Sequence, residues 1–170
     1  MNDIAGKSFI ASIKCVTPGY EGGVIFTTAH QIAKSGWLLR GYEGQPSVPL
    51  RFDYISEGDE RIHYSVSGAP GAGDYVGAKL GVSINGYLGL YHVSSVSDFW
   101  KIEVLGDGSL QDGFRFLLRD HHGQRVAIHS KKEPFGNLAN PHPSNMKRFD
   151  YLSIWDGEIV EFEARIERVL

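Results

Sequence analysis

Apolar and polar residues alternate at every second position in several stretches of the chain. The segments Leu50–Tyr54, Phe114–Arg119 and Val160–Glu167 each place most of their apolar side chains at even positions and their charged side chains at odd positions. On a β-strand this pattern makes one apolar face and one wet face, whereas on a helix the charges would be scattered around the axis. No long segment has a convincing 3.6-residue period, so the pattern predicts an all-β protein.

Turn-forming residues divide this alternating pattern into short elements. The 21 glycines, together with Asn, Asp and Pro, recur between the apolar runs at the short spacing that is typical of an all-β domain. The predicted strands are, in chain order, Phe9–Cys15, Val24–Ala29, Trp37–Tyr42, Leu50–Ile55, Ile62–Ser67, Tyr75–Leu80, Tyr87–His92, Phe99–Leu105, Phe114–Arg119, Arg125–Ser130, a poor candidate near Asn137–Ala139, Phe149–Ile154 and Val160–Val169.

One of these strands is nearly duplicated. Arg-Phe-Asp-Tyr-Ile-Ser at Arg51–Ser56 returns as Arg-Phe-Asp-Tyr-Leu-Ser at Arg148–Ser153, with a weaker copy between them. The aromatic residues Phe52, Trp100 and Phe149 in the three copies lie 48 and 49 positions apart. A segment that recurs at a fixed period of this length indicates a repeated structural unit.

Three units of four strands in one small domain resemble a β-trefoil. The resemblance covers nearly the whole chain, as one domain spanning 1–170, with units roughly at 8–57, 58–107 and 108–170. It implies a short barrel capped by hairpins, in which the three repeated aromatic residues are equivalent core residues around a pseudo-threefold axis. The predicted strand Val160–Val169 then closes the sheet. Another β-barrel or a β-sandwich remains the alternative.

Composition narrows the function classes. The net charge of −3 gives no basic field for phosphate backbones, so we expect no nucleic-acid partner. No apolar run is long enough for a membrane span, and the first residues lack the pattern of a secretory signal. Cys15 is the only cysteine, which excludes an internal disulfide and fits a reducing compartment. We therefore expect a soluble, cytoplasmic protein, with unconventional secretion left open.

No catalytic or metal-binding motif stands out. Asp120-His121-His122-Gly123 reads as a turn rather than a metal site, since adjacent histidines on a strand point to opposite faces. The glycine-rich stretch Gly68–Gly73 lacks the Lys-Ser/Thr of a phosphate-binding loop, and no Gly-x-Ser-x-Gly occurs. Cys15 ends a strand, where a small buried side chain is commoner than a nucleophile. We expect no metal, no cofactor and no enzymatic activity.

Aromatic residues beside the predicted turns suggest a different kind of site. Sugars stack their apolar C–H face on aromatic rings, while neighbouring polar side chains hydrogen-bond their hydroxyls. Aromatic candidates lie on or next to the third strand of the first two units, and polar candidates lie near them under the repeat alignment. The candidate ligand-binding residues are Trp37, Arg40, Tyr42, Tyr87, Tyr91, His92, Asp98, Asn140 and His142.

Trefoil domains resembling this one mostly bind carbohydrates, proteases, receptors or actin, so the first hypothesis is lectin-like binding of glycans or glycoproteins at up to three shallow sites. The Gln-x-Trp signature of ricin-type lectins is absent, and the run Gly86–Leu90 is closer to a pattern in fascin-like trefoils.

The second hypothesis is a protein-interaction module, such as a protease inhibitor or toxin component. It would act through the proline-rich loop 133–145, with Lys131, Lys132 or Asn140 as the recognised side chain.

Overall fold

The computed structural model describes residues 3–26, 36–42, 44–92, 99–134 and 146–170. The protein is all-β, as the alternation predicted. Its elements are β1 (Phe9–Cys15), β2 (Gly22–Phe26), β3 (Leu38–Arg40), β4 (Pro49–Gly58), β5 (Arg61–Gly68), the 3-10 turn η1 (Gly73–Tyr75), β6 (Lys79–Val82), β7 (Leu88–Tyr91), β8 (Trp100–Ser109), β9 (Gly113–Arg119), β10 (Ala127–Pro134), β11 (Met146–Ser153), β12 (Glu158–Ile159) and β13 (Phe162–Val169). None of the helical segments in these ranges is long and apolar enough to cross a membrane.

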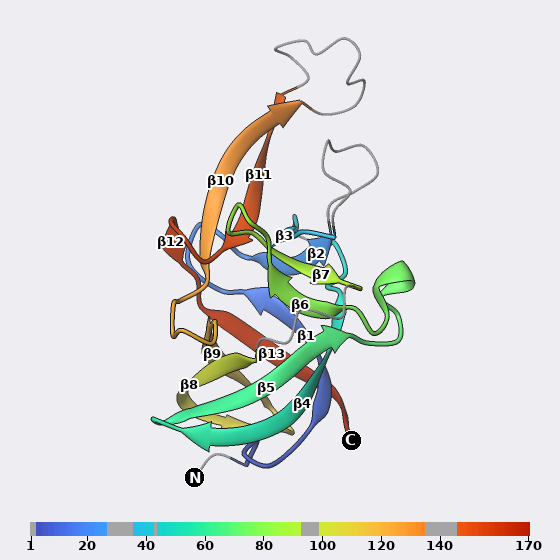
Figure 1. Cartoon of the computed structure of the whole chain (residues 1–170), viewed down its shortest axis with the longest axis vertical. Helices are drawn as coiled ribbons and strands as arrows, with labels where there is room; N and C mark the ends of the chain where they lie inside the picture. The colour runs from blue at the N-terminus through green and yellow to red at the C-terminus, as the bar shows by residue number, and fades with distance from the viewer. Residues whose placement is uncertain (1–2, 27–35, 43, 93–98, 135–145) are drawn as a thin grey trace.

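Within the described ranges, six strands form a closed antiparallel barrel, seen in the lower part of Figure 1. Hydrogen-bonded pairing runs from β1 through β13, β9, β8, β5 and β4, and β4 pairs with β1 again. The prediction that the last strand closes the sheet is confirmed, because β13 pairs with β1 on one side and with β9 on the other. A closed ring leaves no unpaired strand edge.

Aromatic side chains fill the barrel. The rings of Phe9 and Phe52 stack with centroids 5.0 Å apart, and those of Phe116 and Phe162 stack at 5.5 Å. The indole of buried Trp100 donates a hydrogen bond to the carbonyl oxygen of Leu80 at 3.0 Å, which joins the barrel to β6. Burial of apolar side chains such as these stabilises the fold by roughly 25 cal/mol per Å² of apolar surface.

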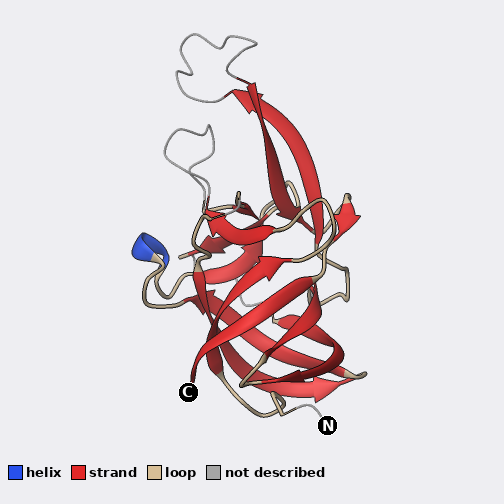
Figure 2. Cartoon of the chain, turned by 180° about the vertical axis from the view of Figure 1, so that it is seen from behind, coloured by secondary structure: helices blue, strands red, loops and turns tan. Residues whose placement is uncertain are grey.

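Hairpins β2–β3, β6–β7 and β10–β11 lie toward one end of the barrel, and β10–β11 extends farthest from it (Figures 1 and 2). Isolated bridges and one strand pairing tie the hairpins together. Tyr151 of β11 pairs with Leu39 of β3, and Trp37 forms a bridge with Gly89 of β7. The hairpin end is therefore a connected structure rather than a set of separate loops.

The second copy of Arg-Phe-Asp-Tyr lies in this hairpin layer and not in the barrel. Phe149 belongs to β11, which pairs with β10 and β3, and it packs in a second, smaller apolar cluster with Leu39 and Tyr151. The prediction that Phe149 is equivalent to Phe52 and Trp100 is therefore wrong. In β11 the residues Phe149–Ser153 are all buried, so the same local alternation lies here in a strand that is covered on both faces.

Most of the predicted strands are present, but apart from β1 their ends differ from the predicted ones. β1 has the predicted bounds, whereas the segment predicted as Tyr75–Leu80 begins with the end of η1, and β6 starts only at Lys79. The 3-10 turn forms because Tyr75 N–H donates back to the carbonyl oxygen of Ala72, a three-residue hydrogen bond that no strand makes. The weak candidate strand near Asn137–Ala139 lies outside the described residues.

Candidate functional site

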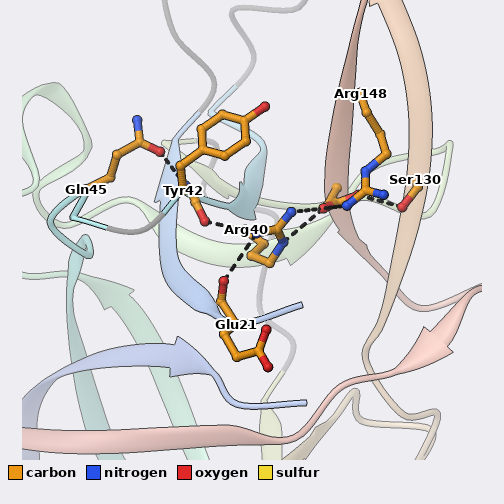
Figure 3. Close-up of polar contacts among 8 residues, drawn as sticks. Glu21, Arg40, Tyr42, Gln45, Ser130 and Arg148 are labelled. Carbon is orange, nitrogen blue, oxygen red and sulfur yellow. Dashed lines mark hydrogen bonds and ion pairs between the residues drawn. The ribbon is translucent and has the colours of Figure 1, made fainter. Parts of the chain in front are cut away.

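A buried ion pair joins the first hairpin to the last. Arg40 at the end of β3 donates from Nε (2.9 Å) and from Nη2 to Oδ2 of Asp150 in β11 (Figure 3). The side chain of Asp150 is 2% exposed and that of Arg40 is 11% exposed. The Ser130 hydroxyl donates to Oδ1 of Asp150, and Arg148 Nη2 donates to Oδ2 at 3.2 Å. Both carboxylate oxygens are thus satisfied, as a buried charge requires.

The same arginine also fixes the chain around it. Its Nη1 donates to the carbonyl oxygens of Glu21 (3.2 Å) and Gly41 (3.4 Å), so it holds the entry to β2 and the exit from β3 together. Sequence reasoning proposed Arg40 as a ligand-binding residue. In the structure its guanidinium already donates to three partners, and its clearest role is to support the residues beside it.

These charges affect two titratable groups. Burial alone raises the pKa of Asp150, but the hydrogen bonds from Ser130 and Arg40 and the charges of Arg40 and Arg148 outweigh it, so this pKa lies below its usual value. Burial raises the pKa of the Cys15 thiol to about 12, with Arg40 opposing the rise and Asp150 adding to it. Cys15 is free and buried, as expected for a packing residue. A thiol with this pKa is a poor nucleophile at neutral pH.

Beside the ion pair lies an open hollow of about 610 Å³. It occupies the surface between the end of β1, the start of β2 and the turn that follows β3. Its lining residues are Lys14, Glu21, Gly22, Gly23, Arg40, Tyr42, Gly44, Gln45 and Ser47. The backbone can pass closely here because Gly22 lies against the backbone of Gly41, where a Cβ atom would collide with a carbonyl oxygen.

The most exposed aromatic side chain of this hollow is Tyr42, which is 47% exposed. Its backbone N–H donates to Oε1 of Gln45 at 2.6 Å, which fixes the turn and leaves the amide nitrogen of Gln45 as a donor (Figure 3). The ammonium of Lys147 lies 4.5 Å from the Tyr42 ring centroid. The hollow therefore combines an accessible aromatic ring with side-chain donors and acceptors on its walls.

Three other predicted aromatic residues belong to a separate cluster. Trp37 and Tyr87 pack with ring centroids 4.8 Å apart, and both contact the fully buried ring of Tyr151. The hydroxyl of Tyr91 is buried near this group, and burial raises its pKa. Trp37 and Tyr87 are only partly buried, so this cluster packs the hairpins together while part of it reaches the surface.

The remaining predicted residues do not join these groups. His92 is exposed, its Nε2 lies 2.6 Å from the carbonyl oxygen of Asp74, and its ring stacks on Tyr75. Asp98, Asn140 and His142 lie outside the described residues, as does most of the proline-rich loop 133–145. The structure thus brings Arg40 and Tyr42 to one hollow and gathers Trp37, Tyr87 and Tyr91 elsewhere.

The histidine-rich turn is a turn, as predicted. Gly123 N–H donates to the carbonyl oxygen of Asp120, and Gln124 N–H donates to the Asp120 carboxylate, which links β9 to β10. His129 faces Asp156 at 3.2 Å instead of joining His121 and His122. In the part of the chain that the structure describes, no three His, Cys, Asp or Glu side chains are placed to hold a metal ion.

Sequence reasoning missed two residues that the structure makes prominent. Asp150 was interpreted as part of a repeated barrel strand, and its partner 110 positions away gave no local signal. Trp155 lies between two predicted strands and was not among the candidate residues, yet it is 62% exposed. A signal for Trp155 was present, because Trp155-Asp156-Gly157 repeats the aromatic-acid-glycine order of Tyr42-Glu43-Gly44.

Comparison with known proteins found no matching family model, no matching curated protein and no matching solved structure. The conclusions below therefore rest on the chemistry of the described residues.

Proposed function

We propose that this protein is a non-enzymatic, carbohydrate-binding β-trefoil. The fold proposal is supported by the recurrence of one arrangement along the chain, in which two barrel strands enclose a hairpin. Facing aromatic residues recur with it, because Phe9 pairs with Phe52, Tyr64 with Trp100, and Phe162 with Phe116 in register. The third pair uses Phe162 in place of Phe149.

The observation that carries the carbohydrate proposal is the half-exposed Tyr42 ring at the edge of a 610 Å³ hollow. A sugar needs an aromatic surface for its C–H face and mixed donors and acceptors for its hydroxyls. Around Tyr42 these groups are the amide of Gln45, the hydroxyl of Ser47 and the carboxylate of Glu21. They hydrogen-bond without requiring a strongly charged ligand, so we propose neutral glycans as the ligands of this hollow.

The test is a glycan array probed with the intact protein and with Tyr42→Ala. Loss of the ring should weaken binding to any positive glycan about tenfold, which corresponds to roughly 1.4 kcal/mol. Tyr42→Phe keeps the stacking surface and should retain most of the binding. Ile84→Ala removes a 91% exposed side chain that does not line the hollow and serves as the matched control. A blank array at high protein concentration would remove the proposal.

The projecting β10–β11 hairpin favours a second candidate, namely binding of a protein partner. Lys131 and Lys132 are exposed on this hairpin, which extends beyond the rest of the molecule in Figures 1 and 2. A protruding segment that carries basic residues suits the cleft of a trypsin-like protease. Under this candidate, Lys132→Ala relieves inhibition of such a protease whereas Tyr42→Ala does not. Absence of inhibition across a panel of serine proteases would count against the inhibitor form of this candidate.

A further inference from the structure

A second, shallower hollow of about 300 Å³ lies where the turn between β9 and β10 meets the turn that follows β11. Its most exposed large apolar side chain is Trp155, and Gly86 lies so close to this indole that a Cβ atom there would collide with it. Gly86 thus supports the indole, while Trp155 as a residue is 62% exposed. A supported and accessible indole is a suitable platform for the apolar face of a ligand.

The same kinds of chain segment build this hollow and the Tyr42 hollow. Tyr42-Glu43-Gly44 follows the second strand of the β2–β3 hairpin, and Trp155-Asp156-Gly157 follows the second strand of the β10–β11 hairpin. The glycines that end these triplets have positive φ angles of 86° and 123°. In each hollow a basic residue from the end of a barrel strand forms another wall, namely Lys14 of β1 and Arg119 of β9.

The Trp155 hollow is lined by several charged side chains. Arg119 donates to Glu103 at 2.7 Å and to the carbonyl oxygen of Gly123 at 3.0 Å, so its guanidinium is already compensated. Asp156 faces His129 at 3.2 Å. Arg125 also lines the hollow, is exposed, and makes no ion pair with a carboxylate among the described residues. The Trp155 hollow therefore presents an indole and the Arg125 guanidinium, with the 77% exposed carboxylate of Asp156 also on its wall.

We propose that the Trp155 hollow is a binding site for an acidic sugar, such as a hexuronic or sialic acid residue. Trp155 stacks against the apolar face of the sugar ring, and Arg125 pairs with its carboxylate, an interaction that the planar guanidinium can make with two hydrogen bonds. The choice of a sugar as ligand rests on the proposed function, whereas the site itself is separate from the Tyr42 hollow.

The test is a titration of the ¹⁵N-labelled whole chain with sodium glucuronate and with sodium N-acetylneuraminate at constant pH and ionic strength. The chain has 3 tryptophans, so its indole N–H signals are few, and Trp155→Phe identifies the one from Trp155. We expect this signal to shift with at least one acidic sugar and to shift less with glucose. Arg125→Gln should raise the apparent Kd at least tenfold, whereas Lys7→Gln, which removes an equal charge from an exposed residue elsewhere, should not change it.

Several results would overturn the proposal. One is a Trp155 signal that responds to neither acidic sugar, and another is an unchanged Kd in Arg125→Gln. An equal shift with sodium acetate would reduce the site to a simple anion site and would also reject an acidic sugar as its ligand. Tyr42→Ala separates the two sites: it should weaken glycan binding at the first hollow about tenfold and leave the Trp155 titration unchanged. A response lost in that variant would contradict two independent sites.

Discussion

The two copies of Arg-Phe-Asp-Tyr have the same four residues and very different surroundings. In β4 the pair Arg51–Asp53 lies on the barrel surface, with side chains 47% and 41% exposed and a nitrogen–oxygen distance of 3.0 Å. In β11 the corresponding Asp150 is buried among Arg40, Ser130 and Arg148. An identical local sequence therefore gives an exposed ion pair in one place and a buried polar network in the other.

The aromatic residues of the two copies differ in the same way. Phe52 packs in the main core of the barrel, whereas Phe149 belongs to the small cluster under the hairpins. The sequence of the two strands alternates in the same way, but their partners differ: β4 pairs with β1 and β5, and β11 pairs with β10 and β3. The comparison teaches that a repeat in sequence does not imply an equivalent position in the fold, and it can be tested with paired substitutions.

The largest expected effect is that of Phe52→Ala. In the main core the centroid of this ring lies 5.0 Å from that of Phe9 and 5.9 Å from that of Tyr64. We expect the free energy of unfolding to fall by about 4 kcal/mol. Phe149→Ala should cost less, about 3 kcal/mol, because the smaller cluster at the hairpins can relax more easily. Guanidinium chloride denaturation of both variants measures the difference. An equal or larger loss in Phe149→Ala would break the distinction between the two aromatic positions.

The next effect is that of removing the carboxylate from each copy. Asp150→Ala leaves Arg40 buried without its partner, so we expect a loss of about 3 kcal/mol in the free energy of unfolding. The matched variant Asp53→Ala removes an exposed ion pair and should cost less than about 1 kcal/mol. Denaturation curves for the two variants side by side make the measurement. Similar losses would show that the Arg40–Asp150 pair contributes no more than a surface pair.

The pH dependence of stability should also separate the two aspartates. Because the folded-state pKa of Asp150 lies below its usual 3.8, its ionised form stabilises the fold above that pH, and this contribution is lost as the pH falls through the folded-state pKa. The difference in free energy of unfolding between the wild type and Asp150→Asn should therefore shrink as the pH is lowered below about 4. Asp53→Asn is the matched control. A wild-type advantage over Asp150→Asn that stays constant down to about pH 2 would contradict the assignment.

The smallest expected effect is that of Ser130→Ala. This change removes one hydrogen bond to Asp150 while both arginines remain, so we expect a loss of about 1 kcal/mol. The control is Ser65→Ala, whose hydroxyl makes a single long contact among the described residues, 3.5 Å from Nζ of Lys79, and this change should cost less than about 0.5 kcal/mol. Thermal unfolding resolves a difference of this size. Equal effects would indicate that Ser130 is not part of the polar network.

Much of the fold could be predicted because period-two alternation is a local property. The bounds of β1 and the positions of most strands follow from residues that are neighbours in sequence. The closing role of the last strand was instead an implication of the trefoil resemblance, because it depends on pairing between the two ends of the chain. The candidate sites were less predictable. The sequence identified Tyr42 as an aromatic residue beside a turn. It did not show that Trp37 and Tyr87 would form a cluster without Tyr42, because that depends on which face each strand presents.

The sequence by itself determined that this chain makes short strands with one apolar face, and that Cys15 is a buried packing residue. Only the tertiary structure decided that β13 with Phe162, and not β11, is a strand of the barrel. It also decided that Asp150 is buried against Arg40 and that Trp155 and Arg125 line the same hollow. The physical reason is that alternation fixes which side chains share a face, whereas the segments that cover that face come from distant parts of the chain.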